Sequence, residues 1–204
     1  MEINQAATEL SVIKKIMEDS RRINIDNGIH YIFWGVLVSV TLLANYFMVL
    51  YKVSLNYIGL MWMIIMIAGA VAGSFINKYQ ERTFRVKTYA GRLLGSLWFA
   101  SGVSMFTYGF IGIITGAYNA IYCCPIIAVS LGISYYTSGA IQQIRWLQYV
   151  AAGWWLGGWA LFYMKSVHIL LVFAIMMICF QLIPGIVLFN KSKREESALQ
   201  NYEL

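Results

Sequence analysis

Acidic side chains are missing from every long apolar run of this 204-residue chain. Proton relays and ion-coupled transporters usually bury an ionisable residue inside the membrane. Carboxylates are also among the groups on which acid–base catalysis depends. The sequence therefore argues against a proton-coupled carrier and against an intramembrane metalloenzyme. The nine acidic residues are Glu2, Glu9, Glu18, Asp19, Asp26, Glu81, Glu195, Glu196 and Glu203.

Histidine and cysteine are scarce as well, with two and three copies. His30 and His168 fall at opposite membrane faces, separated by a hydrocarbon core of about 30 Å, so they cannot ligate one metal or one haem together. Cys123, Cys124 and Cys179 form no Cys-x-x-Cys pair, which argues against a thiol oxidoreductase. Methionines and cysteines near one face suit Cu(I), but no regular methionine array supports such a site. We expect no cofactor, no metal and no catalytic residue.

Apolar sequence, in contrast, is abundant: 60% of the residues are hydrophobic and only 12% are charged. A helix needs roughly 20 mostly apolar residues to cross a bilayer. We predict an all-α, polytopic membrane protein whose six transmembrane helices form one domain, residues 29–190. A cytoplasmic segment, 1–28, precedes this domain and a cytoplasmic tail, 191–204, follows it. The predicted spans are 29–50, 57–77, 93–115, 119–139, 147–164 and 168–189, of which the fifth is short.

The basic residues between these runs alternate by side. With a cytoplasmic N-terminus, 13 of the 15 Lys and Arg lie in inner segments, and the outer loops hold only Lys52 and Lys165. Because short cytoplasmic loops are enriched in Lys and Arg, we predict that both termini are cytoplasmic. Anionic lipid headgroups account for the net charge of +6, so the lipid bilayer is an expected partner and nucleic acid is not. The inner cations are Lys14, Lys15, Arg21, Arg22, Lys78, Arg82, Arg85, Lys87, Arg92, Arg145, Lys191, Lys193 and Arg194.

The outer connections are short, roughly 51–56, 116–118 and 165–167. Such links force neighbouring spans to run antiparallel, so we predict three helical hairpins, one from each successive pair of spans. Pro184 should kink the sixth span, because proline has no backbone N–H and its ring meets the preceding turn. Beyond that span the polar tail is expected to be frayed.

Two cytoplasmic segments are candidates for contact with a partner. Residues 5–23 have the apolar periodicity of an amphipathic helix. Such a helix either lies on the inner membrane surface or docks a cytoplasmic protein, and the first interpretation is favoured. The loop 78–92 is the most basic segment and carries interleaved aromatic residues. It is usually a topology determinant, but it also offers candidate lipid or protein contacts. These candidates are Lys78, Arg82, Phe84, Arg85, Lys87 and Tyr89.

Polar side chains inside the predicted spans are few. Four of them either line a solute path or form interhelical hydrogen bonds: Asn45, Thr107, Asn119 and Gln181. An interhelical hydrogen bond is worth about 0.6 kcal/mol. We favour the hydrogen bonds. Should a cavity reach the outer face, the candidates for lining it are Asn45, Asn119 and Trp155.

Several short motifs are spread over most of the chain. They are Asp26-Asn27-Gly28, Phe33-Trp34-Gly35, Arg85-Val86-Lys87-Thr88-Tyr89, Pro125-Ile126-Ile127, Ser138-Gly139 and Ile183-Pro184-Gly185. In these motifs the chain resembles an uncharacterised family of small bacterial inner-membrane proteins. The resemblance implies six spans and a bacterial inner membrane, and it implies no reaction.

Two functional hypotheses follow. The first is a non-enzymatic accessory or sensing component that acts through protein contacts on the cytoplasmic face. It is favoured because no catalytic constellation accompanies the charged N-terminal helix and the basic, aromatic loop. The alternative is a small-molecule binding or transport subunit, similar in size and number of spans to the substrate-binding subunits of modular vitamin transporters. The sequence carries no signal for an oligomeric state.

Overall fold

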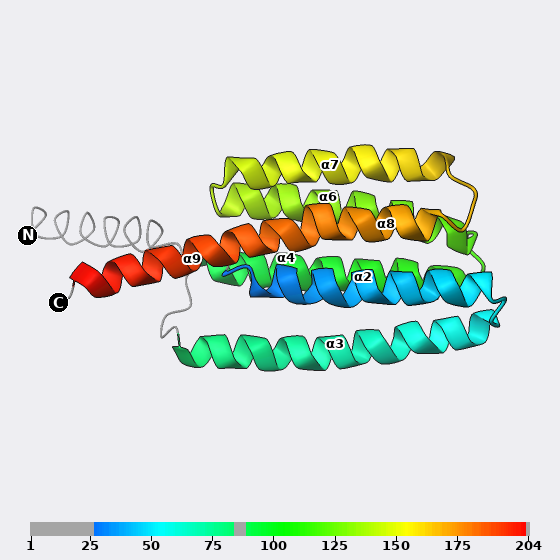
Figure 1. The fold of residues 1–204 in the computed structure, drawn as a ribbon, viewed down its shortest axis with the longest axis horizontal. Coiled ribbons are helices and arrows are strands. Elements are labelled where there is room, and N and C mark those ends of the chain that lie inside the picture. The colour runs from blue at the N-terminus through cyan, green and yellow to red at the C-terminus, as the bar shows by residue number, and fades with distance from the viewer. Residues whose placement is uncertain (1–26, 84–88, 203–204) are drawn as a thin grey trace, which may run out of the picture.

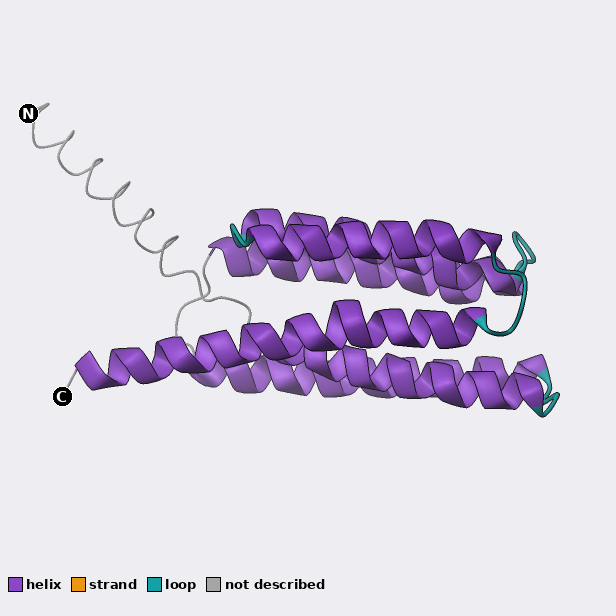
Figure 2. Ribbon diagram, turned by 45° about the horizontal axis from the view of Figure 1, so that its top comes forward, coloured by secondary structure: helices purple, strands orange, loops and turns teal. Residues whose placement is uncertain are grey.

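The computed structural model describes residues 27–83 and 89–202, and every regular element within them is helical. Six long helical rods lie alongside one another (Figure 1 and Figure 2), which confirms the all-α prediction. Two of the rods contain a π-helical turn. The elements are α2 (Ile29–Leu50), α3 (Leu55–Thr83), α4 (Tyr89–Phe106), the π-helix η1 (Thr107–Ile111), α5 (Gly112–Ile114), the 3-10 helix η2 (Ala120–Tyr122), α6 (Cys123–Ile141), α7 (Arg145–Tyr163), α8 (Ile169–Met177), the π-helix η3 (Ile178–Leu182) and α9 (Ile183–Tyr202).

Five of these rods are long and apolar enough to cross a membrane. They match the first, second, third, fourth and sixth predicted spans. The fifth, α7, is not among the five, although its 19 residues extend about 28 Å at 1.5 Å per residue. The reason is its composition, since Arg145, Gln148 and three glycines interrupt its apolar residues.

The most extensive packing in the described bundle joins α6 to α7. These helices are linked by residues 142–144, in which Gln143 has a positive φ of 56°. Gly132 faces the indole of Trp155, and a Cβ on Gly158 would stand 3.2 Å from Ala128 Cβ, so small residues allow the close approach. By contrast, α7 touches α8 much less. Helices from different predicted hairpins, such as α6 and α7, therefore pack together more extensively than the two helices of one hairpin, such as α7 and α8. A short link brings two helices side by side, but small residues determine how closely helices pack.

Helix α2 packs against the whole rod α8–η3–α9. Three glycines allow this contact. A Cβ added at Gly185 would stand 2.8 Å from both Ile32 N and Tyr31 Cβ, and one at Gly35 would stand 3.1 Å from the backbone of Leu182. Gly28, in the left-handed region at φ 72°, lies directly against the carbonyl oxygen of Gly185. Residues 28–35 therefore meet residues 182–189 backbone to backbone.

Helix α3 lies at one edge of the bundle (Figure 1), and α2 is the neighbour that it contacts extensively. The side chains of Leu37 and Trp34 of α2 pack against Gly69 of α3. Most of its other apolar side chains are exposed, including Leu55 and Phe75. An apolar helix with so much exposed surface is suited to lipid, because lipid tails are as apolar as a protein core.

Two polar segments are more helical than expected. The segment 78–92 is not one loop, because α3 continues through Thr83 and α4 begins at Tyr89. Residues 77–82 of α3 contain neither glycine nor proline, the two residues least favourable in a helix, so the helix continues through them. The tail was expected to fray, but α9 continues as a helix through Tyr202. The predicted helix at 5–23 lies outside the described residues.

At the expected kink, the sixth rod contains a π-helical turn, η3, immediately before Pro184. The N–H of Ile183 donates to the carbonyl of Ile178, five residues earlier, in place of the α-helical partner. Proline cannot supply the next N–H of an α-helical ladder, and its ring crowds the preceding turn. π-helical structure occurs mostly as single turns of this kind inside longer α-helices.

Candidate functional site

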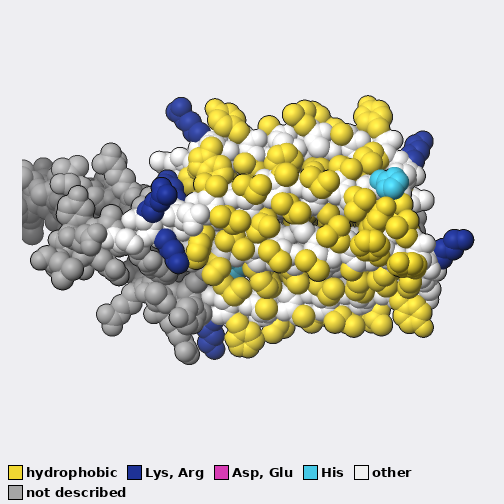
Figure 3. All heavy atoms as spheres, in the orientation of Figure 1, with side chains coloured by type: hydrophobic (Ala, Val, Ile, Leu, Met, Phe, Trp, Pro, Cys, Tyr) yellow, Lys and Arg dark blue, Asp and Glu magenta, His cyan; other side chains and the backbone are white. Residues whose placement is uncertain are grey.

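Charge separates the two ends of the bundle. We call the end at which α3 finishes and α7 begins the basic end. It carries Lys78, Arg82, Arg92, Arg145, Lys191, Lys193 and Arg194. The described part of the chain has two further cations, Lys52 and Lys165, both at the opposite end. Figure 3 shows cations at the two ends and a broad hydrophobic band between them. This pattern fits the predicted excess of Lys and Arg in the inner segments over the outer loops.

Helical extensions make the basic end more than a set of loops. The C-terminal part of α9 projects past the other described helices (Figure 1). Its residues 191–202 extend about 18 Å at 1.5 Å per residue. At the start of this extension Lys193 Nζ lies 5.0 Å from the centroid of the Phe189 ring. A cation at this distance from an aromatic face is attracted by the ring quadrupole, which favours one position of the lysine.

The predicted contact residues of segment 78–92 are divided by the structure. Lys78 is exposed on α3, Arg82 belongs to the last turns of the same helix, and Tyr89 is the first residue of α4. Phe84, Arg85 and Lys87 lie outside the described residues. The structure therefore places half of the set on two helix ends and leaves the contact prediction itself untested.

An aromatic cluster fills the core near the basic end. Tyr31, Trp98 and Tyr135, from three different helices, contact one another edge to face, with centroids 5.4, 5.4 and 5.9 Å apart. Trp154 of α7 lies 6.1 Å from Tyr135 and 5.8 Å from Phe180 of η3. Edge-to-face rings at these distances are in mutually favourable contact. The cluster thus joins α2, α4, α6, α7 and η3 through direct ring contacts.

Within this cluster lies a buried hydrogen bond between two rods. The hydroxyl of Tyr135 donates to Oε1 of Gln181 at 2.7 Å, and both residues are buried. Gln181 belongs to the π-turn η3. A second interhelical bond joins Ser101 of α4 to Ser134 of α6, with the two Oγ atoms 2.8 Å apart. The favoured interhelical hydrogen bond is thus confirmed for Gln181, whereas Thr107 Oγ1 donates within its own rod, to the carbonyl oxygen of Val103. Tyr135 was missed, because a buried tyrosine and a lipid-facing one look alike in sequence.

The three candidate cavity residues come from three different parts of the fold: α2, the connection before η2, and α7. Asn119 is exposed, and its Oδ1 accepts from the backbone N–H of Ile121 at 3.1 Å, so it caps η2. Trp155 Nε1 donates to the carbonyl oxygen of Val129 at 3.2 Å and ties α7 to α6. Asn45 is half-buried on α2. Two of the three thus have a structural contact that needs no ligand.

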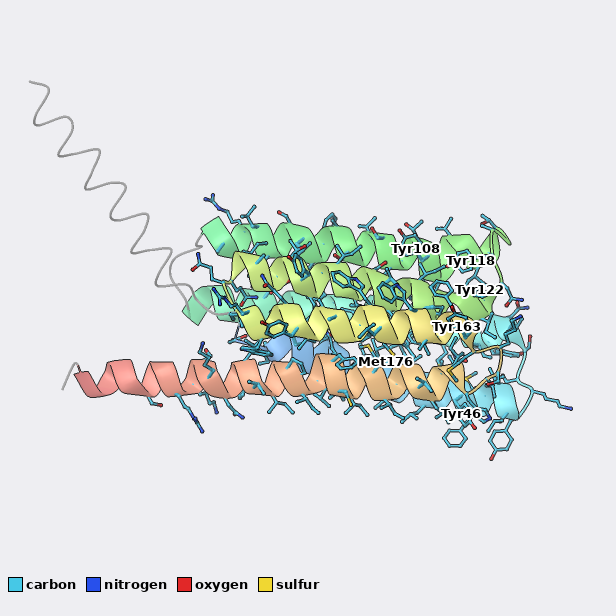
Figure 4. All side chains as sticks on the ribbon, turned by 90° about the horizontal axis from the view of Figure 1, so that it is seen from above. Tyr46, Tyr108, Tyr118, Tyr122, Tyr163 and Met176 are labelled. Carbon is cyan, nitrogen blue, oxygen red and sulfur yellow. The ribbon has the colours of Figure 1, made fainter. Side chains whose placement is uncertain are left out.

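Tyrosines gather at the end opposite the basic end. Figure 4 shows Tyr108, Tyr118, Tyr122 and Tyr163 in succession there, with Tyr46 at the same end. The hydroxyl of Tyr118 donates to the carbonyl oxygen of Tyr108, within the π-turn η1. Burial, followed by the nearby Cys123 and Tyr108, raises the pKa of Tyr118 above its ordinary value of 10.0. Amphipathic tyrosine rings of this kind are typical of a membrane–water interface.

Histidine and cysteine lie apart, as their positions in the sequence predict. His30 begins α2, whereas His168 is the N-cap of α8 at the opposite end, where its Nδ1 is 3.4 Å from the hydroxyl of Tyr46. Cys123 and Cys124 begin α6, and Cys179 lies in η3. Over residues 27–83 and 89–202, no three His, Cys, Asp or Glu side chains come together as a metal site would require.

Comparison with known proteins adds no relative: no family model, no curated protein and no solved structure matches this chain. The resemblance to small bacterial inner-membrane proteins therefore stays a prediction. Functional inference has to start from the basic end and the core of this chain alone.

Proposed function

We propose that this chain is a six-span protein of a bacterial inner membrane, with both termini in the cytoplasm. In this proposal it is an accessory or sensing component without catalytic activity. It works by binding a protein at its basic end. The observation that carries the proposal is that α3 and α9 continue as helices beyond their apolar spans at this end.

In this proposal α7 is the fifth of the six spans. Although its composition is less apolar than that of the other rods, it lies along α6 over its whole length (Figure 1). Its Leu147, Trp154 and Leu161 are completely buried by neighbouring helices. A helix packed in this way against a membrane-spanning partner occupies the same depth, so it needs less apolar surface toward lipid. The positive-inside rule then places the basic end in the cytoplasm.

Helical extensions support protein contact more than lipid contact alone. Anionic headgroups lie at the membrane surface, and their attraction falls off within a Debye length, about 8 Å at physiological ionic strength. Taken along the membrane normal, the 18 Å extension of α9 ends beyond that layer. A helix in water gains most of its stability from packing rather than from propensity. A protein partner would supply such packing for the part of α9 that leaves the bundle.

Site-specific photo-crosslinking in the native membrane tests this proposal. A photoreactive amino acid is placed at Lys78 or at Ser197, which are exposed at the basic end on α3 and α9. The matched control positions are the exposed Lys52 and Lys165 at the opposite end. We expect a discrete polypeptide adduct from the first pair and none from the second. Lipid adducts alone, or the same adducts from both pairs, would overturn the proposal.

Orientation is tested separately, in a chain whose native cysteines are replaced by alanine. A single cysteine replaces Ser54 or Ser166, at the end opposite the basic end, or Ser197, on the extension of α9. In intact cells a membrane-impermeant maleimide should label the first two positions and leave the third unlabelled until the membrane is opened. The reverse pattern would place the basic end outside, and contact with a cytoplasmic protein would then be refuted.

Small-molecule binding, the second hypothesis, is not favoured by the described contacts. It would be favoured by a polar cavity that reaches the outer face and is lined by Asn45, Asn119 or Trp155. Asn119 instead caps a helix and Trp155 bonds a neighbouring backbone carbonyl. The core near the basic end is likewise filled by the direct ring-to-ring contacts of the aromatic cluster. The first hypothesis therefore remains the proposal.

A further inference from the structure

We draw no further inference here: the strongest candidate, the stripe of Gly95, Gly102 and Gly109 along α4 and η1, where an added Cβ would meet open space at each position, is a row of small residues on an unpartnered apolar face, and nothing in the described part of the chain shows whether lipid, a second copy or another protein covers it.

Discussion

Replacing Gly185 by alanine should separate close helix packing from helix propensity. Alanine is favoured over glycine in a helix by about 1 kcal/mol, which would stabilise the variant if space were available. At Gly185 a new Cβ would lie 2.8 Å from Ile32 N and from Tyr31 Cβ, which is closer than real Cβ contacts. One of these atoms belongs to the backbone, so it cannot move as a flexible side chain would. Overpacking of this kind typically costs about 1–3 kcal/mol.

The matched control is Gly102→Ala on α4, where the same added methyl group meets no atom within 4 Å. Both substitutions gain the same propensity term, so the difference between them isolates the contact with α2. We expect Gly185→Ala to be about 1–3 kcal/mol less stable than Gly102→Ala. The assay is reversible unfolding in mixed detergent–SDS micelles, followed by tryptophan fluorescence and by far-UV circular dichroism. A difference smaller than about 0.5 kcal/mol, the usual scatter of independent sites, would refute the close crossing of α2 and α9.

A second pair of variants tests the same crossing from the other helix. Gly28 and Gly116 both have positive φ, 72° and 69°, but only Gly28 is crowded, by Gly185 O, Leu188 and Phe189. Alanine at either position incurs the left-handed backbone penalty of about 1–2 kcal/mol. Gly28→Ala should therefore be the more destabilising of the two, and its effect should not add to that of Gly185→Ala. Equal destabilisation by Gly28→Ala and Gly116→Ala would contradict the contact.

Two further predictions concern side-chain hydroxyls. Tyr135→Phe should destabilise the bundle by about 0.6 kcal/mol, and by no more than about 1.7 kcal/mol, because it removes a hydrogen bond to Gln181. A double-mutant cycle that combines it with Gln181→Leu should give a coupling energy of the same size. A coupling energy of zero would exclude this hydrogen bond. Burial raises the pKa of Tyr118 above 10.0, so its contribution to stability is complete below pH 10 and is lost as the pH rises through the folded-state pKa. Between pH 8 and pH 11, the unfolding midpoint should therefore decrease more for the native chain than for Tyr118→Phe. Equal decreases in the two proteins would show that the Tyr118 hydroxyl does not contribute to stability in this way.

The number and extent of the helices could be predicted largely from hydropathy. Five of the six predicted spans are apolar enough to cross a membrane, and α7 coincides with the remaining one, the fifth, to within two residues at its start. The polar ends were predicted less well, because hydropathy locates the end of an apolar run and not the end of a helix. Lys78 and Arg82 are good helix formers, so α3 continues through them.

Helix packing could not be predicted, and the reason lies in the solvent. In water an apolar stripe marks the buried face of a helix, but in a bilayer the exposed face is apolar as well. The adjacent Tyr135 and Tyr136 illustrate this, since the first is completely buried and the second is half exposed. Gly185 and Gly102 are likewise indistinguishable in sequence, although one lies against a neighbouring backbone and the other faces open space.

The π-turn at Ile178–Leu182 has a consequence for how homologous chains align. A π-turn encloses one more residue between its bonded groups than an α-turn does, so η3 amounts to a one-residue insertion in a membrane-spanning helix. On either side of it, α8 and α9 each keep their own face against α2. A homologue with one residue fewer in this span would preserve both faces only if its alignment gap fell within these five positions. Loss of a residue elsewhere would rotate one half of the rod by about 100° and remove Gly185 from the crossing.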